Sequence, residues 1–119
     1  DQRYGYFRSE SHALRDAAYE LIPGMVSEVL DSIGWKGSDI DLGCGHQVTE
    51  EIVMGIRERC GVLPGRAVVT VTDCGNTAAA SIPLCLGRAY DEGKLTPGTK
   101  VLLVGGAAGF SVGVVPVVW

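Results

Sequence analysis

The sequence predicts one α/β domain in which helices pack on a mixed β-sheet. β-favouring runs alternate with helical patterns along the chain, and only a short glycine-rich segment separates the last two β-favouring runs. A chain of 119 residues, of which 46% are hydrophobic and 20% charged, has the size and composition of one globular domain. Alternating strands and helices form a mainly parallel sheet, which a final hairpin closes. The expected element order is β-α-β-α-β-α-β-β.

The chain begins with a short aromatic run and one long helical pattern. Residues 4–8 favour a strand. From residue 11 to residue 33, apolar side chains recur every three or four positions, which is typical of a helix with one buried face. They are Leu14, Ala18, Leu21, Ile22, Met25, Val26, Val29 and Ile33. Because Pro23 removes a backbone hydrogen bond and clashes with the preceding turn, we expect a kink or a break near Leu21.

The middle of the chain predicts two strands with a helix between them. Residues 40–45 indicate a short strand, and His46 follows its end. Thr49 can cap a helix that ends at Gly61, with an acidic first turn and an apolar inner face. These residues are Glu50, Glu51, Ile52, Val53 and Ile56. Residues 67–72 (AVVTVT) are β-branched and nearly continuously apolar, as buried parallel strands are, and we expect a strand there.

The last part of the chain predicts one helix and a β-hairpin. Residues 78–90 begin with small side chains that allow close packing, although Pro83 conflicts with a helix at this place. Residues 100–104 and 111–119 indicate strands, and residues 105–109 a flexible glycine-rich turn between them. The sequence therefore ends with two strands and no helix between them.

Polar or glycine-rich features follow three of the predicted strands. His46 comes after the second strand, Asn76 after the third and the 105–109 turn after the fourth. Gly75 permits a positive φ, and Asn76 can cap the helix that follows it. Because ligands bind at the carboxyl ends of strands in such sheets, we expect these three features to meet at one site. The structural alternatives are a packed histidine and a simple turn with a helix cap.

Charge, cysteine spacing and glycine pattern exclude several kinds of function. The net charge of −4 and the scattered Lys and Arg residues argue against nucleic acid as a partner, and no apolar run approaches the roughly 20 residues of a membrane span. The four cysteines contain no Cys-x-x-Cys pair, so we expect no metal site and a reducing compartment, the cytoplasm. Residues 101–109 resemble a phosphate-binding turn, but a dinucleotide fingerprint needs a helix after the glycines, and here a β-favouring run follows. This pattern argues against a nucleotide site.

Several motifs, spread over nearly the whole chain, resemble those of a known family. They are His46-Gln47, GNTAAASIPL at 75–84, GKLTPG at 93–98, the strand at 101–104, Gly109-Phe110 and the terminal Trp119. Together they resemble the C-terminal half of the β-ketoacyl-acyl-carrier-protein synthase III family, in the thiolase superfamily. The resemblance implies that residues 1–119 are the C-terminal, thiolase-like domain of an enzyme built from two similar α/β halves.

The resemblance also implies an acyltransferase chemistry for this chain. In that family a Cys from the N-terminal half takes up an acyl group, and a malonyl thioester then loses CO₂. His46 and Asn76 are implied to stabilise the enolate oxygen while the carbanion attacks. The backbone N–H groups of Ala107, Ala108 and Gly109 are implied to help hold the acyl-enzyme oxyanion. No cofactor is implied, because coenzyme A or acyl-carrier thioesters are the substrates.

The nucleophile that the family uses has no counterpart in this chain. None of the four cysteines stands where the family places it, and the first residue is Asp rather than Met. We therefore expect the chain to be inactive alone. It needs an N-terminal half that carries the Cys, either as a separate chain or as the rest of one polypeptide. The complete enzyme is expected to be a homodimer, as its relatives are.

The sequence also departs from the family pattern beside His46. Where the family has the motif His-Gln-Ala-Asn, this chain has His46-Gln47-Val48-Thr49. We expect Gln47, Val48 and Thr49 to lie along the channel for the thioester substrate. Glu50 and Glu51 stand where relatives have a basic residue, which disfavours docking of an acidic carrier protein. The 107–109 segment is AAG where relatives have three glycines, which narrows the space beside the nucleophile.

The leading functional hypothesis is decarboxylative condensation of thioesters in fatty acid or polyketide biosynthesis. One alternative is transfer of an acyl group to an oxygen or nitrogen acceptor without decarboxylation, in specialised metabolism, which Thr49 and the two glutamates motivate. Another is a non-catalytic partner subunit. Retention of both His46 and Asn76 argues against that second alternative, because a silent copy has no chemical need for either.

Overall fold

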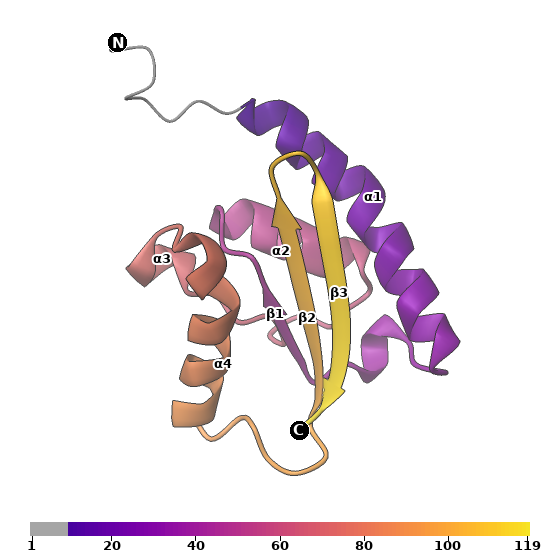
Figure 1. The fold of residues 1–119 in the computed structure, drawn as a ribbon. Coiled ribbons are helices and arrows are strands. Elements are labelled where there is room, and N and C mark those ends of the chain that lie inside the picture. Colours follow the sequence, from indigo (N-terminus) through magenta and orange to yellow (C-terminus); the bar gives the residue numbers. More distant parts are fainter. Residues whose placement is uncertain (1–9) are drawn as a thin grey trace.

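A mixed three-stranded sheet with helices on both faces forms the centre of the protein (Figure 1). The computed structural model describes residues 10–119, so the strand predicted at 4–8 lies outside the described residues. The elements are α1 (Ser11–Ser32), the 3-10 helix η2 (Gly37–Asp39), β1 (Leu42–Gly45), α2 (Glu50–Arg59), α3 (Val71–Cys74), the 3-10 helix η3 (Ala78–Ala80), α4 (Ser81–Asp91), β2 (Lys100–Ala107) and β3 (Ser111–Val118).

The sheet has the order β1-β2-β3. β1 runs parallel to β2, with Leu42 opposite Val101, and β2 runs antiparallel to β3 as a hairpin. The mixed sheet and the final hairpin are therefore confirmed. The predicted turn at 105–109 is wrong at its start, because residues 105–107 belong to β2 and pair with residues 111–113. Only residues 108–110 form the turn.

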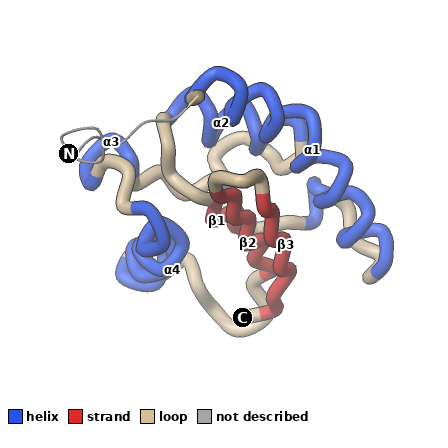
Figure 2. Tube along the Cα trace, turned by 45° about the horizontal axis from the view of Figure 1, so that its top comes forward, coloured by secondary structure: helices blue, strands red, loops and turns tan. Residues whose placement is uncertain are grey.

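The two faces of the sheet are covered by different helices, as the three layers in Figure 2 show. Adjacent side chains of β2 point to opposite faces, since successive residues of a strand alternate. Leu102 packs in a core with the buried face of α1, and Val101 packs in a second core with α4. The first core contains Ile22, Val26, Leu30, Ile40, Val62, Leu102 and Val104, and the second contains Leu42, Cys44, Val68, Cys85, Ala89, Leu95 and Val101.

Of the kink or break predicted near Leu21, the break does not occur, because helix α1 continues through Pro23. Proline inside a helix costs about 3 kcal/mol or more. Ile22 before it and Val26 after it are both buried against the sheet, and burial of two such side chains is worth about as much. Leu21 and Met25, predicted for the buried face, are exposed. Within residues 10–119 no helix, α1 included, is both long and apolar enough to span a membrane.

The segment predicted as the clearest strand, residues 67–72, is not a strand. Its only pairing with β1 is the isolated parallel bridge between Gly43 and Ala67, and helix α3 begins at Val71. β1 continues to Gly45, but no backbone hydrogen bond joins Gly45 to residues 68–70, and the Gly45 carbonyl accepts from the Gln47 side chain instead. β-branched composition alone does not make a strand where backbone pairing with the neighbouring strand stops.

The predicted helix at 78–90 is divided into η3 and α4. Residues 78–80 form a 3-10 turn, and α4 begins at Ser81. Pro83 is the third residue of α4, where a backbone N–H would have no partner inside the helix, so its presence is tolerated. Ser81, Cys85 and Ala89 follow at spacings of four and are buried, so small side chains bring this face of α4 close to the sheet.

Gly37 provides a test of how closely η2 packs on the end of α2. A Cβ at this position would lie within 2.1 Å of the Cys60 carbonyl oxygen and 2.7 Å of Gly61 backbone. We predict that Gly37→Ala lowers the free energy of unfolding by about 1–3 kcal/mol, measured by urea denaturation. Gly24→Ala is the control, because space around Gly24 in α1 is open, and it should raise stability by about 0.5–1 kcal/mol. Equal effects of the two substitutions would contradict the close packing.

Candidate active site

His46 lies at the point where β1 stops. Its backbone N–H donates to the carbonyl oxygen of Val104 at 2.9 Å, which extends the parallel pairing with β2 by one residue beyond Gly45. The residue is partly buried, and it lines a cavity at this end of the sheet. The strand pairing thus fixes the backbone from which the imidazole projects.

Asn76 lies in a tight loop between α3 and η3. Gly75 before it has φ 69° and ψ −164°, a region that essentially only glycine occupies. The Asn76 Oδ1 atom accepts a hydrogen bond from the Ala78 N–H at 3.0 Å, and Ala78 itself has a φ of 50°. The expected role of Asn76 as the cap of the long helix is wrong, since α4 begins five residues later. Because Oδ1 is bound to the backbone, the Nδ2 group is the part of the amide available to a ligand.

One cavity of about 650 Å³ brings the predicted residues together. His46, Asn76, Ala107 and Ala108 all line it, although they come from three separate parts of the chain. Its remaining wall is largely apolar and lies between α1, α2 and the sheet, with Leu14, Ala18, Ile22, Ile52, Val53 and Ile56 among its members. The three features expected to meet at one site do line one cavity, although the segment before Asn76 is not the predicted strand.

Two of the residues predicted for the site do not line this cavity. Val48 and Thr49 do, but Gln47, predicted to lie along the same channel, is 0% exposed and its side chain points into the protein. Gly109 lies in the β2–β3 turn with a φ of 82° and is absent from the lining, whereas Gly106 and Phe110 belong to it. The channel prediction for Gln47 is therefore wrong, because its amide bonds to buried backbone groups.

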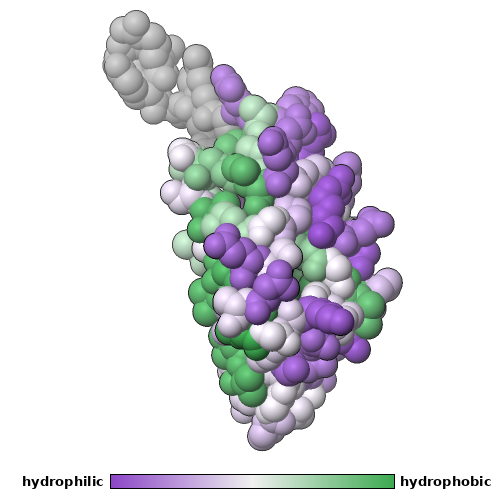
Figure 3. Space-filling model, turned by 90° about the vertical axis from the view of Figure 1, so that its right-hand side faces the viewer, coloured by the Kyte–Doolittle hydropathy of each residue, from purple (hydrophilic) through white to green (hydrophobic). Residues whose placement is uncertain are grey.

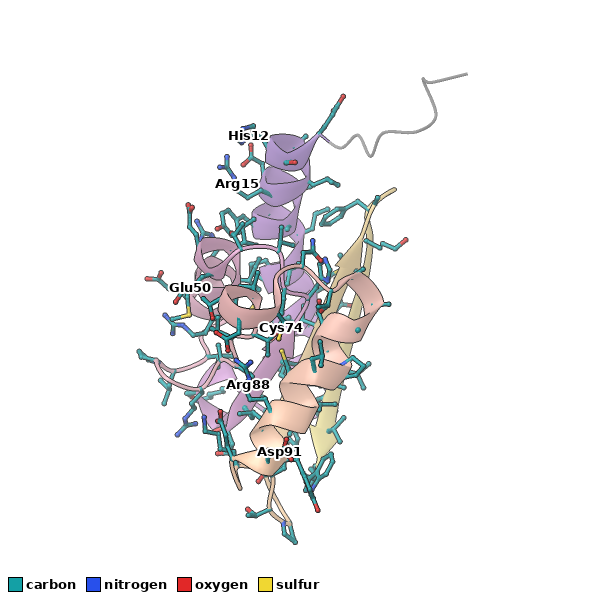
Figure 4. The ribbon with its side chains drawn as sticks, turned by 90° about the vertical axis from the view of Figure 1, so that its left-hand side faces the viewer. His12, Arg15, Glu50, Cys74, Arg88 and Asp91 are labelled. Carbon is teal, nitrogen blue, oxygen red and sulfur yellow. The ribbon has the colours of Figure 1, made fainter. Side chains whose placement is uncertain are left out.

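Polar and charged side chains at the starts of α1 and α2 line the cavity or lie next to residues that do. His12 and Arg15 lie on the first turns of α1 and Glu50 at the start of α2, as Figure 4 shows, and Glu51 also lines the cavity. Hydrogen bonding and charge pairing with Asp16 raise the pKa of Arg15, and the charge of Glu51 adds to this. Sequence reasoning missed His12 and Arg15, since a helical pattern identifies the buried face and says nothing of which exposed end meets a cavity.

The start of α2 is fixed as the sequence predicts. The Thr49 side chain accepts a hydrogen bond from the Ile52 N–H at 3.2 Å, and Glu50 and Glu51 occupy the first turn. Carboxylates are favourable there because the helix dipole is positive at its N-terminus. Thr49 therefore has two roles, since it caps α2 and also lines the cavity.

The cysteines of the chain are poor nucleophiles for this site. Cys44 lines the cavity, but its hydrogen bond with Cys85 and its burial raise the pKa of its thiol. Burial also raises the pKa of Cys60 to about 11. Cys74 is exposed and stands outside the cavity lining. The hydrogen bond with Cys44 lowers the pKa of Cys85 to about 7, but Cys85 is buried and does not line the cavity. The thiolate is the reactive form, so no described cysteine combines a favourable pKa with a place beside His46 and Asn76. Residues 10–119 also bring together no three His, Cys, Asp or Glu side chains that could hold a metal ion.

Comparisons with known proteins agree on one family. Residues 30–119 match the model for the C-terminal domain of 3-oxoacyl-[acyl-carrier-protein] synthase III. A β-ketoacyl-[acyl-carrier-protein] synthase III of Streptomyces coelicolor is 34% identical over 96% of the chain and 34% of its own length. The chain thus spans about a third of the length of the curated relatives it matches.

Solved structures of the same family have the same fold. The 3-oxoacyl-(acyl carrier protein) synthase III of Pseudomonas aeruginosa PAO1 superposes with a TM-score of 0.89 at 33% identity, over 96% of this chain and 36% of that one. The enzyme from Aquifex aeolicus VF5 superposes with a TM-score of 0.91 at 30% identity, over 97% and 37%. The thiolase-like α/β fold expected from the sequence is therefore confirmed.

The backbone at Gly75 offers a test of the loop that carries Asn76. We predict that Gly75→Ala lowers the free energy of unfolding by about 1–3 kcal/mol, because its φ and ψ are strained for any other residue. Space is not the cause, since a Cβ at Gly75 would meet nothing within 4 Å. Gly87→Ala, in the middle of α4 with equally open surroundings, should instead stabilise by about 0.5–1 kcal/mol. Thermal or urea unfolding of both variants measures the difference, and no loss at Gly75 would contradict the strained loop.

Proposed function

The chain belongs to the 3-oxoacyl-[acyl-carrier-protein] synthase III family, and on that premise we propose that it supplies the C-terminal half of a thioester acyltransferase site. The observation that carries the proposal is that His46 and Asn76, 30 positions apart in sequence, line one cavity. The reaction is decarboxylative condensation, completed by a cysteine from an N-terminal half.

The two side chains stabilise the negative charge that develops during decarboxylation. The bond between the malonyl carboxylate and the α-carbon breaks, and CO₂ leaves. The electron pair of that bond forms an enolate on the thioester. An imidazole N–H of His46 and the Nδ2 group of Asn76 donate to the enolate oxygen, and the Ala78 N–H holds the amide in the required orientation. The α-carbon then attacks the acyl group on the cysteine, a C–C bond forms, and the cysteine thiolate leaves.

An N-terminal half is the proposed partner, and exposed apolar side chains on several elements support it. Figure 3 shows hydrophobic surface along one margin of the face in view and hydrophilic side chains over much of the rest. Leu84 on α4, Val115 and Val118 on β3, and Trp119 are all more than a third exposed. Large apolar surface of this kind marks an interaction site. The intact mass of the purified protein tests whether a cysteine-bearing segment accompanies this chain.

Substitution of Asn76 tests the catalytic pair. Asn76→Asp keeps the oxygen that accepts from Ala78 but removes the Nδ2 donors, so the loop should persist while the enolate loses a hydrogen bond. We predict a fall in kcat of about 10²–10³-fold for Asn76→Asp, and a similar fall for His46→Ala, in the complete enzyme. Release of labelled CO₂ from carboxyl-labelled malonyl thioester measures the step. Full activity in both variants would support the non-catalytic partner subunit instead.

Thr49, Glu50 and Glu51 favour a second reaction. In this reaction an acyl group is transferred to an oxygen or nitrogen acceptor, and no CO₂ is released. The same labelled assay distinguishes the two reactions, because acceptor acylation without labelled CO₂ contradicts condensation. Coenzyme A or acyl-carrier thioesters as substrates, cytoplasmic location and a homodimer of the complete enzyme stay predictions.

Glu50 allows a test of carrier-protein docking. It is exposed at the start of α2, between Thr49 and Glu51, which line the cavity, and we expect it to repel an acidic carrier protein. We predict that Glu50→Lys raises kcat/KM for an acyl-carrier thioester several-fold at low salt, and that the gain disappears at high salt. Glu58→Lys, the same charge change at the other end of α2, is the control and should have little effect. Equal gains from both variants would mean that the net charge of the protein, and not the charge at position 50, governs the encounter with the carrier protein.

A further inference from the structure

The side chain of Gln47 makes four hydrogen bonds, all to backbone groups of the protein. The residue is 0% exposed and follows His46 directly. Its Nε2 group donates to the carbonyl oxygens of Gly45 and Val68, at 3.1 Å each. Its Oε1 atom accepts from the N–H groups of Thr70 at 2.9 Å and Val71 at 3.1 Å. A primary amide has two N–H donors and two acceptor lone pairs, so every one of them is used.

These bonds take the place of backbone pairing with Gly45. Residues 66–68 pair with β1 through the Gly43 N–H and carbonyl groups, at 2.7 and 2.9 Å, and the pairing stops there although β1 continues to Gly45. The Gln47 amide instead connects the end of β1 with the other segment. It donates to the carbonyl oxygens of Gly45 and Val68 and accepts from the N–H groups of residues 70 and 71.

The same bonds fix the beginning of α3. Thr70 and Val71 are the N-cap and first residue of this helix, and Thr70 offers no side-chain cap of its own. Gln47 Oε1 accepts from both of their N–H groups, which are among those that a helix leaves unpaired at its start. α3 is four residues long and leads directly into Gly75 and Asn76. The placement of Asn76 thus depends on a side chain next to His46.

We propose that Gln47 is a positioning residue that sets the place of Asn76 relative to His46 across the cavity, an inference that rests on the proposed function. It touches neither the cavity nor anything bound there, so it acts only through the two backbone segments. Without it, the buried N–H groups of Thr70 and Val71 and the carbonyl of Val68 lose their partner, and the short α3 loses its anchor. Donors that stabilise an oxyanion must be held within a fraction of an ångström, so a small shift of α3 lowers the rate.

Gln47→Met tests the inference in the complete enzyme, because methionine has a similar shape and makes none of the four bonds. We expect kcat to fall at least tenfold while KM for the thioester changes less than threefold. Val26→Ala is the stability control. Val26 is on the buried face of α1 and does not line the cavity, so this variant should unfold more easily and keep its kcat. A Gln47→Met enzyme that keeps its kcat, or a Val26→Ala enzyme of equal stability that loses as much, overturns the inference.

A double variant identifies the residue through which Gln47 acts. If Gln47 works by placing Asn76, then adding Gln47→Met to Asn76→Asp should lower kcat less than twofold further, since the donor is already gone. If the losses in kcat of the two single variants multiply in full, Gln47 acts through a residue other than Asn76. Unchanged activity in Asn76→Asp and His46→Ala contradicts the proposed function itself. Loss in those two variants with full activity in Gln47→Met contradicts only the positioning role.

Discussion

The parallel pairing of β1 with β2 is the interaction on which the rest of the structure depends. It places the end of β1 opposite Val104, and the His46 N–H adds a further bond to that residue. Since β2 continues to Ala107, the strand extends past His46 and brings residues 106–108 to the same cavity. The helices follow from the same pairing, because the alternating side chains of β2 give each face of the sheet its own apolar core.

The second half of the site depends on hydrogen bonds to the backbone rather than on a regular element. Asn76 stands after a four-residue helix, between a glycine with a positive φ and an alanine with a positive φ. Local preference alone would not hold such a segment, since a positive φ at a residue other than glycine, here Ala78, costs about 1–3 kcal/mol. The Gln47 amide anchors its beginning, and the Asn76 side chain closes its end onto Ala78. A strained loop held at both ends is suited to orient one donor.

The cavity combines an apolar wall with polar and charged side chains. The apolar residues line the same cavity as His46 and Asn76, and electrostatic interactions are stronger where the surroundings are apolar. His12, Arg15 and Glu51 line it as well. Charge complementarity affects the rate of encounter and the choice of partner more than affinity.

The sequence by itself determined the elements with strong local signals and some of the residues that line the cavity. The helix after Thr49, the final hairpin, and His46 and Asn76 as site residues all follow from caps, periodicity, glycines and a family resemblance carried by local motifs. Only the tertiary structure decided the rest. Residues 67–72 have a strand's composition, but they pair with β1 only at Ala67, and the last two of them belong to α3. Pro23 should break α1, but burial on both sides outweighs its cost. Gln47 looks like a channel residue beside His46, and it is buried because distant backbone groups require its amide, a long-range demand that no local pattern contains.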